Sequence, residues 1–178
     1  MFFVIFSKVQ DKVYKEIDSI VGDDQVTANH RPLLPYTVAT LYEIWRCGPV
    51  GPLAAFRCPR YDTKVGKYTI FKGTKVHLNV YSMTKDPCLW GPDVDDFNPE
   101  RFMDGNNFKN DWWDFTFGTG RRKCLGESVA KIENFLFFAN MLKNFKLEVP
   151  EDDILPTTEP LDGMTIGPHH FNVKLTSR

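Results

Sequence analysis

The chain has 178 residues, and its 22 Lys and Arg residues nearly balance 23 Asp and Glu residues, which leaves a formal net charge of −1. That balance gives no electrostatic reason to expect nucleic acid or an anionic membrane surface as a partner. Hydrophobic residues make up 42% of the chain, a share that is ordinary for a globular domain with one core.

The apolar run MFFVIF at the start is too short for a membrane span and carries no signal-peptide pattern. After it, VQDKVYKEIDSIVG predicts an amphipathic helix with Gly22 as its C-cap. Its expected apolar stripe consists of Val9, Val13, Ile17 and Ile20. A second helix is predicted in LPYTVATLYEIWR, opening at Pro35 and ending before CGPVGP.

Residues 57–81 have a strand-like pattern, in which KYTIF and KVHLNVY lie on either side of the turn KGT. The next segment, KDPCLWGPDVDDFNPERF, is a long irregular meander of the kind that usually serves binding. A long apolar helix, ESVAKIENFLFFANMLKNF, and a strand–turn–strand tail complete the chain. Because no linker divides these elements, we expect one domain or part of one, mainly α with small β-sheets (α+β).

The four cysteines, at positions 47, 58, 88 and 124, include no C-x-x-C pair, which argues against a zinc ribbon or a thioredoxin-type site. Cys124 differs from the others because it lies in a glycine-rich, cationic loop, FGTGRRKCLG, directly before a helix. Backbone N–H groups and the helix macrodipole at that position favour a thiolate over a thiol. Such a sulfur suits either nucleophilic catalysis or metal ligation.

A nucleophilic role normally needs a nearby base, and the four histidines are all remote from Cys124 in sequence, although none is excluded in space. Phe117 offers an apolar ring, and an arginine can pair with a carboxylate of a ligand. Haem, a planar carboxylated macrocycle with a central iron, would use all of these features. A small cysteine-based enzyme or a metal-free interaction module remains the alternative.

The loop resembles the haem-binding signature F-x-x-G-x-R-x-C-x-G of the cytochrome P450 family, and its fixed positions are Phe117, Gly120, Arg122, Cys124 and Gly126. The resemblance implies that Cys124 is the proximal ligand of haem iron and that its thiolate favours O–O cleavage. It also implies that Arg122 holds one haem propionate and that Arg60, in CPRY, contacts the second.

Two further elements resemble family motifs: E-x-x-R appears as EIWR, with Glu43 and Arg46, and P-x-R-F appears as PERF, with Arg101. An E-x-x-R pair alone is a weak signal, because such pairs are common on helix surfaces. Together the motifs imply a buried triad of Glu43, Arg46 and Arg101 that holds the meander against the second helix. A triad of this kind is stable only when every charge has a partner.

The order of the elements resembles the C-terminal part of the P450 fold, with the J, K and L helices, the meander, the cysteine-ligand loop and a C-terminal β-hairpin. The resemblance implies that residues 1–178 are a single partial domain, without the N-terminal anchor and the oxygen-activating I helix. No catalytic residue is therefore expected within this chain. Departures such as Thr116 and Phe71, where proline is usual, remove no metal ligand.

The implied function is that of a haem-thiolate monooxygenase of the microsomal type. It would insert one oxygen atom into an apolar small molecule and take electrons from an NADPH-dependent reductase flavoprotein that docks near Arg121 and Lys123. Substrate contacts are expected from residues 50–54 and 161–166. The resemblance implies the endoplasmic reticulum membrane as location, with membrane association only of the full-length protein. The alternative is a non-catalytic or inert haem-binding fragment.

Overall fold

The structure is a computed structural model that describes residues 1–109 and 115–178, with the side chains of Phe3 and Phe115 outside that description. The α-helices are α1 (Phe2–Ile5), α2 (Ser7–Val21), α3 (Pro35–Cys47), α4 (Val80–Thr84), α5 (Pro87–Trp90) and α6 (Glu127–Asn144). Short 3-10 helices are η1 (Ala28–Leu33), η2 (Pro99–Phe102), η3 (Phe115–Phe117) and η4 (Gly120–Arg122). The helices expected at positions 9–22, from Pro35, and after the cysteine loop are therefore confirmed as α2, α3 and α6.

The strands form antiparallel pairs and no larger sheet within the described part of the chain. They are β1 (Thr63–Val65) with β2 (Tyr68–Ile70), β3 (Met103–Asp104) with β4 (Asn107–Phe108), β5 (Phe145–Glu148) with β8 (Lys174–Ser177), and β6 (Pro160–Leu161) with β7 (Gly167–Pro168). The β6–β7 pair is the expected C-terminal hairpin. The fold is thus mainly helical with small sheets, as predicted.

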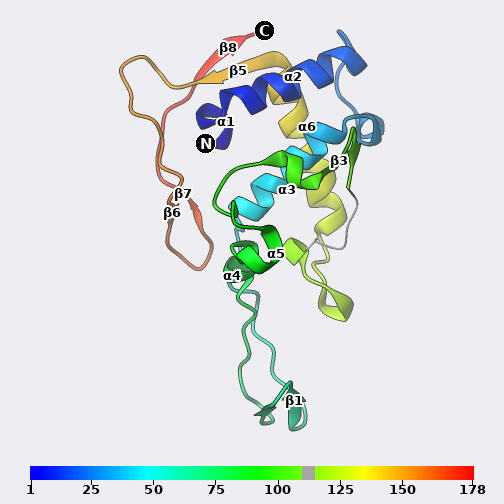
Figure 1. Cartoon of the computed structure of the whole chain (residues 1–178), viewed down its shortest axis with the longest axis vertical. Coiled ribbons are helices and arrows are strands. Elements are labelled where there is room, and N and C mark those ends of the chain that lie inside the picture. Colours follow the sequence, from blue (N-terminus) through cyan, green and yellow to red (C-terminus); the bar gives the residue numbers. More distant parts are fainter. Residues whose placement is uncertain (110–114) are drawn as a thin grey trace.

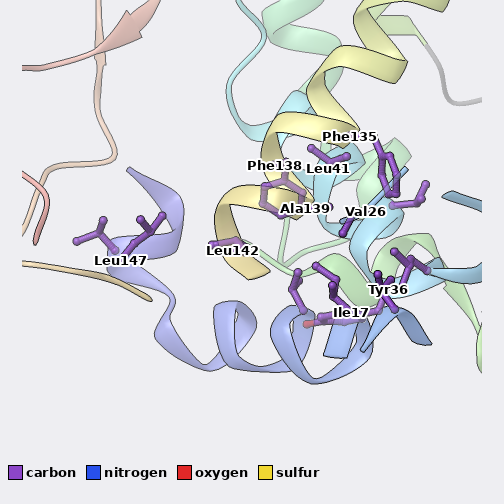
Figure 2. Close-up of a cluster of buried hydrophobic side chains, with 14 residues drawn as sticks. Ile17, Val26, Tyr36, Leu41, Phe135, Phe138, Ala139, Leu142 and Leu147 are labelled. Atoms are coloured by element: carbon purple, nitrogen blue, oxygen red, sulfur yellow. The ribbon is translucent and has the colours of Figure 1, made fainter. Parts of the chain in front are cut away.

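The core lies where α2, α3 and α6 meet, with β5 at its edge (Figure 1, Figure 2). Ile17, Phe135 and Leu142 are fully buried in it. Each fully buried side chain of this size contributes about 1.5–3 kcal/mol relative to exposure, so this contact stabilises the three helices as one body.

The apolar stripe of α2 differs from the prediction by one position. Val13 and Ile17 are fully buried, but Ile20 is 49% exposed, and Val21 takes its place in the core. Gly22 ends the helix with a φ of 59°, as expected of a C-cap glycine. Toward the N-terminus, Val9 is partly buried against the core, as expected, and Gln10 is fully buried beside it. The sequence pattern missed Gln10 because glutamine is polar.

Gln10 is buried because its side-chain amide copies the hydrogen bonding of a strand. Its Nε2 donates to the carbonyl of Leu147 over 2.9 Å, and the Leu147 amide donates to its Oε1 over 2.6 Å. Both atoms of a buried amide are thereby satisfied, which removes the cost of burying it. This pair joins α2 to β5 across 137 positions of the sequence.

Residues 51–79 form an arm that extends away from the helices and carries β1 and β2 at its tip (Figure 1). The expected strand pair around KGT is wrong. β2 instead pairs backward with β1 across a turn at Gly66, where φ is 56°. The second expected strand contributes only isolated bridges, Arg57 with Val76 and Leu53 with Asn79, because it pairs with the other side of the arm.

Within the described residues, no helix combines the length and the apolar character that crossing a bilayer requires.

Candidate functional site

Glu43 and Arg46 form a bidentate ion pair in the interior, near the C-terminal end of α3. Arg46 Nε lies 2.7 Å from Glu43 Oε2, and Arg46 Nη2 lies 2.8 Å from Oε1. The two side chains are 1% and 0% exposed. A buried charge is tolerated only when its hydrogen-bonding capacity is filled, so the surrounding groups determine whether this pair is stable.

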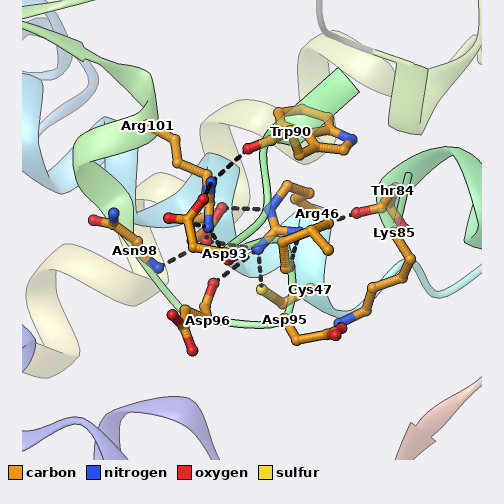
Figure 3. Close-up of polar contacts among 12 residues, drawn as sticks. Arg46, Cys47, Thr84, Lys85, Trp90, Asp93, Asp95, Asp96, Asn98 and Arg101 are labelled. Atoms are coloured by element: carbon orange, nitrogen blue, oxygen red, sulfur yellow. Dashed lines mark hydrogen bonds and ion pairs between the residues drawn. The ribbon is translucent and has the colours of Figure 1, made fainter. Parts of the chain in front are cut away.

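Backbone carbonyls of the segments around the meander fill the remaining capacity of Arg46 (Figure 3). Its Nη1 donates to the carbonyls of Thr84 and Val94 over 3.0 and 2.7 Å, and its Nη2 donates to the carbonyl of Asp96 over 3.0 Å. Burial is the largest single influence and by itself would lower the pKa of Arg46, but the hydrogen bond and charge of Glu43, together with the neighbouring Cys47 and Asp93, more than offset it, so the pKa is raised. The guanidinium therefore holds the meander to α3 as a permanent cation.

Arg101 brings η2 into the same network. Its Nε lies 3.4 Å from Glu43 Oε1, and its Nη1 donates to the carbonyl of Trp90 over 2.7 Å and to Oδ1 of Asp93 over 2.9 Å. The structure thus brings Glu43, Arg46 and Arg101 together and adds Asp93, which the sequence analysis missed. The hydrogen bond from Arg101 holds the pKa of Asp93 below its usual value. The acidic run GPDVDD before PERF was the available signal.

The cysteine loop is closed by a backbone hydrogen bond between its two ends. The amide of Cys124 donates to the carbonyl of Phe117 over 2.8 Å. Gly118 and Gly120 adopt φ values of 76° and 69° inside the loop, a conformation that side chains disfavour. Gly126 is the N-cap of α6, so Cys124 lies just before the first turn of that helix. The Cys124 residue is exposed.

The three cationic residues before Cys124 differ in their partners. Lys123 Nζ lies 2.7 Å from Glu127 Oε2, and Lys131 lies 2.7 Å from the other oxygen of that carboxylate. Arg121 and Arg122 are exposed, and neither forms an ion pair with any residue that the structure describes. Of the two residues expected to receive the reductase, Lys123 is therefore already paired within the loop and α6.

These features fit a haem ligated through Cys124. A macrocycle with an axial sulfur needs an accessible thiol, cations for its carboxylates and apolar surface for its faces. The loop offers the exposed Cys124, the unpaired Arg122 and the side chain of Leu125, which is fully exposed. A Cβ on Gly126 would lie 4.0 Å from the Cys124 sulfur, an ordinary van der Waals distance, so Gly126 lies directly beside the sulfur.

Cys47 shows why the other thiol near the ion-pair network is a poor ligand. Burial, and then the Glu43 carboxylate, raise the pKa of Cys47 to about 12. Its sulfur already accepts a hydrogen bond from Arg46 Nη2 over 3.1 Å. Since a metal binds the thiolate and not the thiol, Cys47 is disfavoured at neutral pH.

Arg60 and Phe117 lie in different surroundings. Arg60 is exposed on the arm, and no hydrogen bond or ion pair among the described residues joins it to the cysteine loop. Arg57, which the sequence analysis did not select, is half-buried and fixed by reciprocal backbone hydrogen bonds with Val76. Phe117 is half-buried, and its ring meets that of Trp45 edge-on, with centroids 5.4 Å apart.

The two segments expected to contact substrate are brought together. The amide of Ile166 donates to the carbonyl of Val50 over 3.0 Å. Both residues line a largely apolar cavity of about 260 Å³, together with Phe2, Ile44 and Tyr81.

The histidines of the described residues form no hydrogen bond with Cys124. His30 accepts the amide of Thr27, and His77 packs on Phe56. No hydrogen bond among the described residues joins a histidine to Cys124, so the arrangement of a thiol beside a base is not found there. Groups of three or more His, Cys, Asp or Glu able to hold a metal ion are also not found among those residues.

The comparisons with known proteins agree on one family. The model of the family "Cytochrome P450" matches residues 7–175. Cytochrome P450 2U1 of Mus musculus is 38% identical over 96% of this chain, and steroid 17-alpha-hydroxylase/17,20 lyase of Gallus gallus is 38% identical over all of it. A zebra fish cytochrome P450 structure with abiraterone matches 99% of the chain at 34% identity with a TM-score of 0.91.

The match covers a limited part of each relative: 32% of the mouse protein, 36% of the chicken protein and 42% of the zebra fish chain. The chain thus spans about a third of the length of the curated relatives it matches. Since the family model nevertheless covers nearly all of this chain, and the fold agrees, the chain belongs to the cytochrome P450 family.

Proposed function

We propose that this chain is the haem-binding carboxyl-terminal part of a cytochrome P450 monooxygenase, with Cys124 as the axial ligand of the iron. One observation carries the proposal: an exposed thiol stands at the end of a closed glycine loop directly before α6, and the two neighbouring arginines have no acidic partner among the described residues. The N–H groups of the first turn of α6 stabilise negative charge on the sulfur.

The other residues of the loop bind and shield the group. Arg122 pairs with a haem propionate, and the Phe117 ring limits the access of water to the sulfur. Gly120 and Gly126 let the backbone approach the macrocycle. The second propionate is held by an arginine of the arm: Arg60 is the choice from the resemblance, and Arg57 is the alternative because its backbone is braced against Val76.

Bound haem supplies the activation of molecular oxygen, from which one atom is inserted into an apolar small molecule. This chain contributes two segments to the substrate side, 50–54 and 161–166, and Val50 and Leu161 are among their exposed apolar side chains. Similar proteins named farnesoate epoxidase and steroid 17-alpha-hydroxylase/17,20 lyase support an apolar substrate. Arg121 is the cation of the loop that is open to an acidic surface of an NADPH-dependent reductase.

We further propose that residues 1–178 are a partial domain of a protein of the endoplasmic reticulum membrane and are not catalytic alone. Phe137 on α6 is 75% exposed and Val129 is 59% exposed, on the helix that follows the cysteine loop. Large exposed apolar side chains on a helix that is otherwise part of the core are typical of a surface that packs against another part of a protein. The oxygen-activating residues would belong to other parts of the protein.

The test is the absorption spectrum of the purified chain after reconstitution with haem. We expect the reduced, carbon-monoxide-bound form to show the red-shifted Soret band of a thiolate complex, and Cys124→Ala to abolish it together with haem retention. Cys88→Ala is the matched control, because Cys88 is also an exposed thiol but lies on α5. Equal haem content in the two variants would refute the assignment of the ligand. Turnover with a reductase then separates an active protein from a haem-binding fragment.

A further inference from the structure

The position of Cys124 depends on the position of Phe117. The hydrogen bond of 2.8 Å between the Cys124 amide and the Phe117 carbonyl joins the two ends of the loop. The residues between them include two glycines with positive φ, Gly118 and Gly120, and a second backbone hydrogen bond inside the loop joins the Lys123 amide to the Gly120 carbonyl, so this closure is what ties the thiol's backbone to Phe117. A shift of Phe117 therefore moves the backbone that carries the thiol.

The Phe117 ring is in turn held by Trp45 of α3. The two ring planes meet at 86°, with centroids 5.4 Å apart, which is the edge-to-face geometry that aromatic pairs prefer. Lys131 of α6 lies over the same ring, with its Nζ 5.7 Å from the centroid. Trp45 is itself supported by Tyr42, one turn earlier on α3, at a centroid distance of 5.0 Å.

Trp45 lies in a tightly held segment, the C-terminal end of α3. The next residue, Arg46, is 2% exposed and holds the carboxylate of Glu43 and carbonyls of the meander. The C-terminal end of α3 is thus held firmly against the meander. The Trp45 side chain projects from this fixed end and therefore gives the cysteine loop a fixed surface to pack on.

We propose that Trp45 is a positioning residue for Cys124 and acts through the ring of Phe117. It does not touch the thiol. Without the indole edge, the Phe117 carbonyl loses its fixed place and the hydrogen bond to the Cys124 amide opens more often. The thiol then turns away from the first turn of α6. What the sulfur binds rests on the function proposed above, whereas its positioning rests only on contacts within this chain.

Amide hydrogen exchange of the full chain tests the positioning directly. We expect Trp45→Leu to speed exchange of the Cys124 amide about tenfold, the scale of losing one aromatic pair. Trp45→Phe should restore most of the protection because it keeps a ring edge. Phe117→Leu removes the other half of the pair and should match Trp45→Leu. Unchanged exchange in both Leu variants would overturn the inference.

A core variant separates positioning from general stability. Ile17→Val lowers the stability of the core around α2 and lies outside the aromatic contacts of the loop. We expect wild-type exchange of the Cys124 amide in Ile17→Val under native conditions. If its acceleration equals that in Trp45→Leu, the effect is global unfolding and Trp45 has no special role.

The haem-loaded protein gives a second readout. At equal haem content, we expect Trp45→Leu to lower the fraction of the reduced carbon-monoxide complex that carries the thiolate-type Soret band, and Trp45→Phe to leave it unchanged. An unchanged fraction in Trp45→Leu would count against the inference. If the wild-type protein lacks that band altogether, the proposed function fails, and the exchange measurement still decides the role of Trp45.

Discussion

The ion-pair network around Arg46 and the loop around Cys124 both contain arginine side chains, but these cations are satisfied in opposite ways. Arg46 and Arg101 find all their partners inside the chain, in Glu43, Asp93 and backbone carbonyls. In the loop, the Cys124 thiol and Arg122 are exposed and contact no acidic group of the described residues. The first region is therefore structural, and for the second we propose that a bound group supplies the missing partners.

Removing the central carboxylate is the strongest test of this comparison. Glu43→Ala leaves two buried guanidinium groups without their shared anion and should cost about 3–5 kcal/mol of unfolding free energy. Chemical denaturation measures it. The control is Lys12→Ala, which breaks an ion pair whose side chains are 54% and 53% exposed and should cost no more than about 1 kcal/mol. Equal losses would place both pairs at the surface and end the comparison.

The apolar residues of the two regions should differ in the same sense. Leu142 is fully buried beside α2, and Leu142→Ala should cost about 2–5 kcal/mol in denaturation experiments. Leu125, in the loop, is fully exposed, and Leu125→Ala should change the stability of the chain by no more than about 0.5 kcal/mol. A large cost for Leu125→Ala would mean that the loop packs on this chain rather than facing outward.

The sequence could predict the helices because their signals are local. Pro35 opens α3, Gly22 caps α2, and the spacing of Glu43 and Arg46 is contained in one helical turn. The burial of Gln10 was missed because its amide bonds to Leu147, which lies 137 positions away. No local pattern carries that information.

The sequence could not predict how the network is completed. Arg101 lies 58 positions from Glu43, and only the resemblance to a family brought them together. The carbonyls of Thr84, Val94 and Asp96 are backbone groups, which every residue has, so no sequence pattern marks them. The pairing of the strands near KGT was wrong for a related reason. The sequence pattern marks strand-forming segments but does not say which segment each one pairs with.

The reactivity of the cysteine thiols tests the same difference between the buried network and the exposed loop. We expect an alkylating reagent at about pH 8 to modify Cys58, Cys88 and Cys124 well before Cys47, because burial raises the pKa of Cys47 to about 12. Mass spectrometry of the modified peptides measures the order. Early modification of Cys47 would mean that the network opens in solution.

The same thiol predicts a loss of stability in alkali. The unfolded chain ionises Cys47 near the ordinary value of 9.0, whereas the folded chain keeps it protonated up to about 12. The stability from this group is therefore fully present below pH 9.0 and is lost as the pH rises toward 12. Cys47→Ala should show a shallower alkaline decline than the wild-type chain, and parallel curves would contradict the shift.

The smallest expected effect lies at Asp93, where the network reaches solvent. Arg101 donates to its carboxylate and lowers its pKa below 3.8, so the folded state holds fewer protons than the unfolded state in that range. The stability it provides is present above pH 3.8 and disappears as the pH falls through the lower folded value. Asp93→Asn should therefore be slightly less stable than wild type at neutral pH, as measured by chemical denaturation, and the difference should shrink in acid.

The Asp93 side chain is 44% exposed, whereas that of Glu43 is fully buried. Because solvent screens an exposed ion pair, the interaction of Asp93 with Arg101 should be weaker than that of Glu43. If Asp93→Asn loses as much unfolding free energy as Glu43→Ala, Asp93 contributes as strongly as a buried member of the network. If it loses none at any pH, Arg101 depends on Glu43 and not on Asp93.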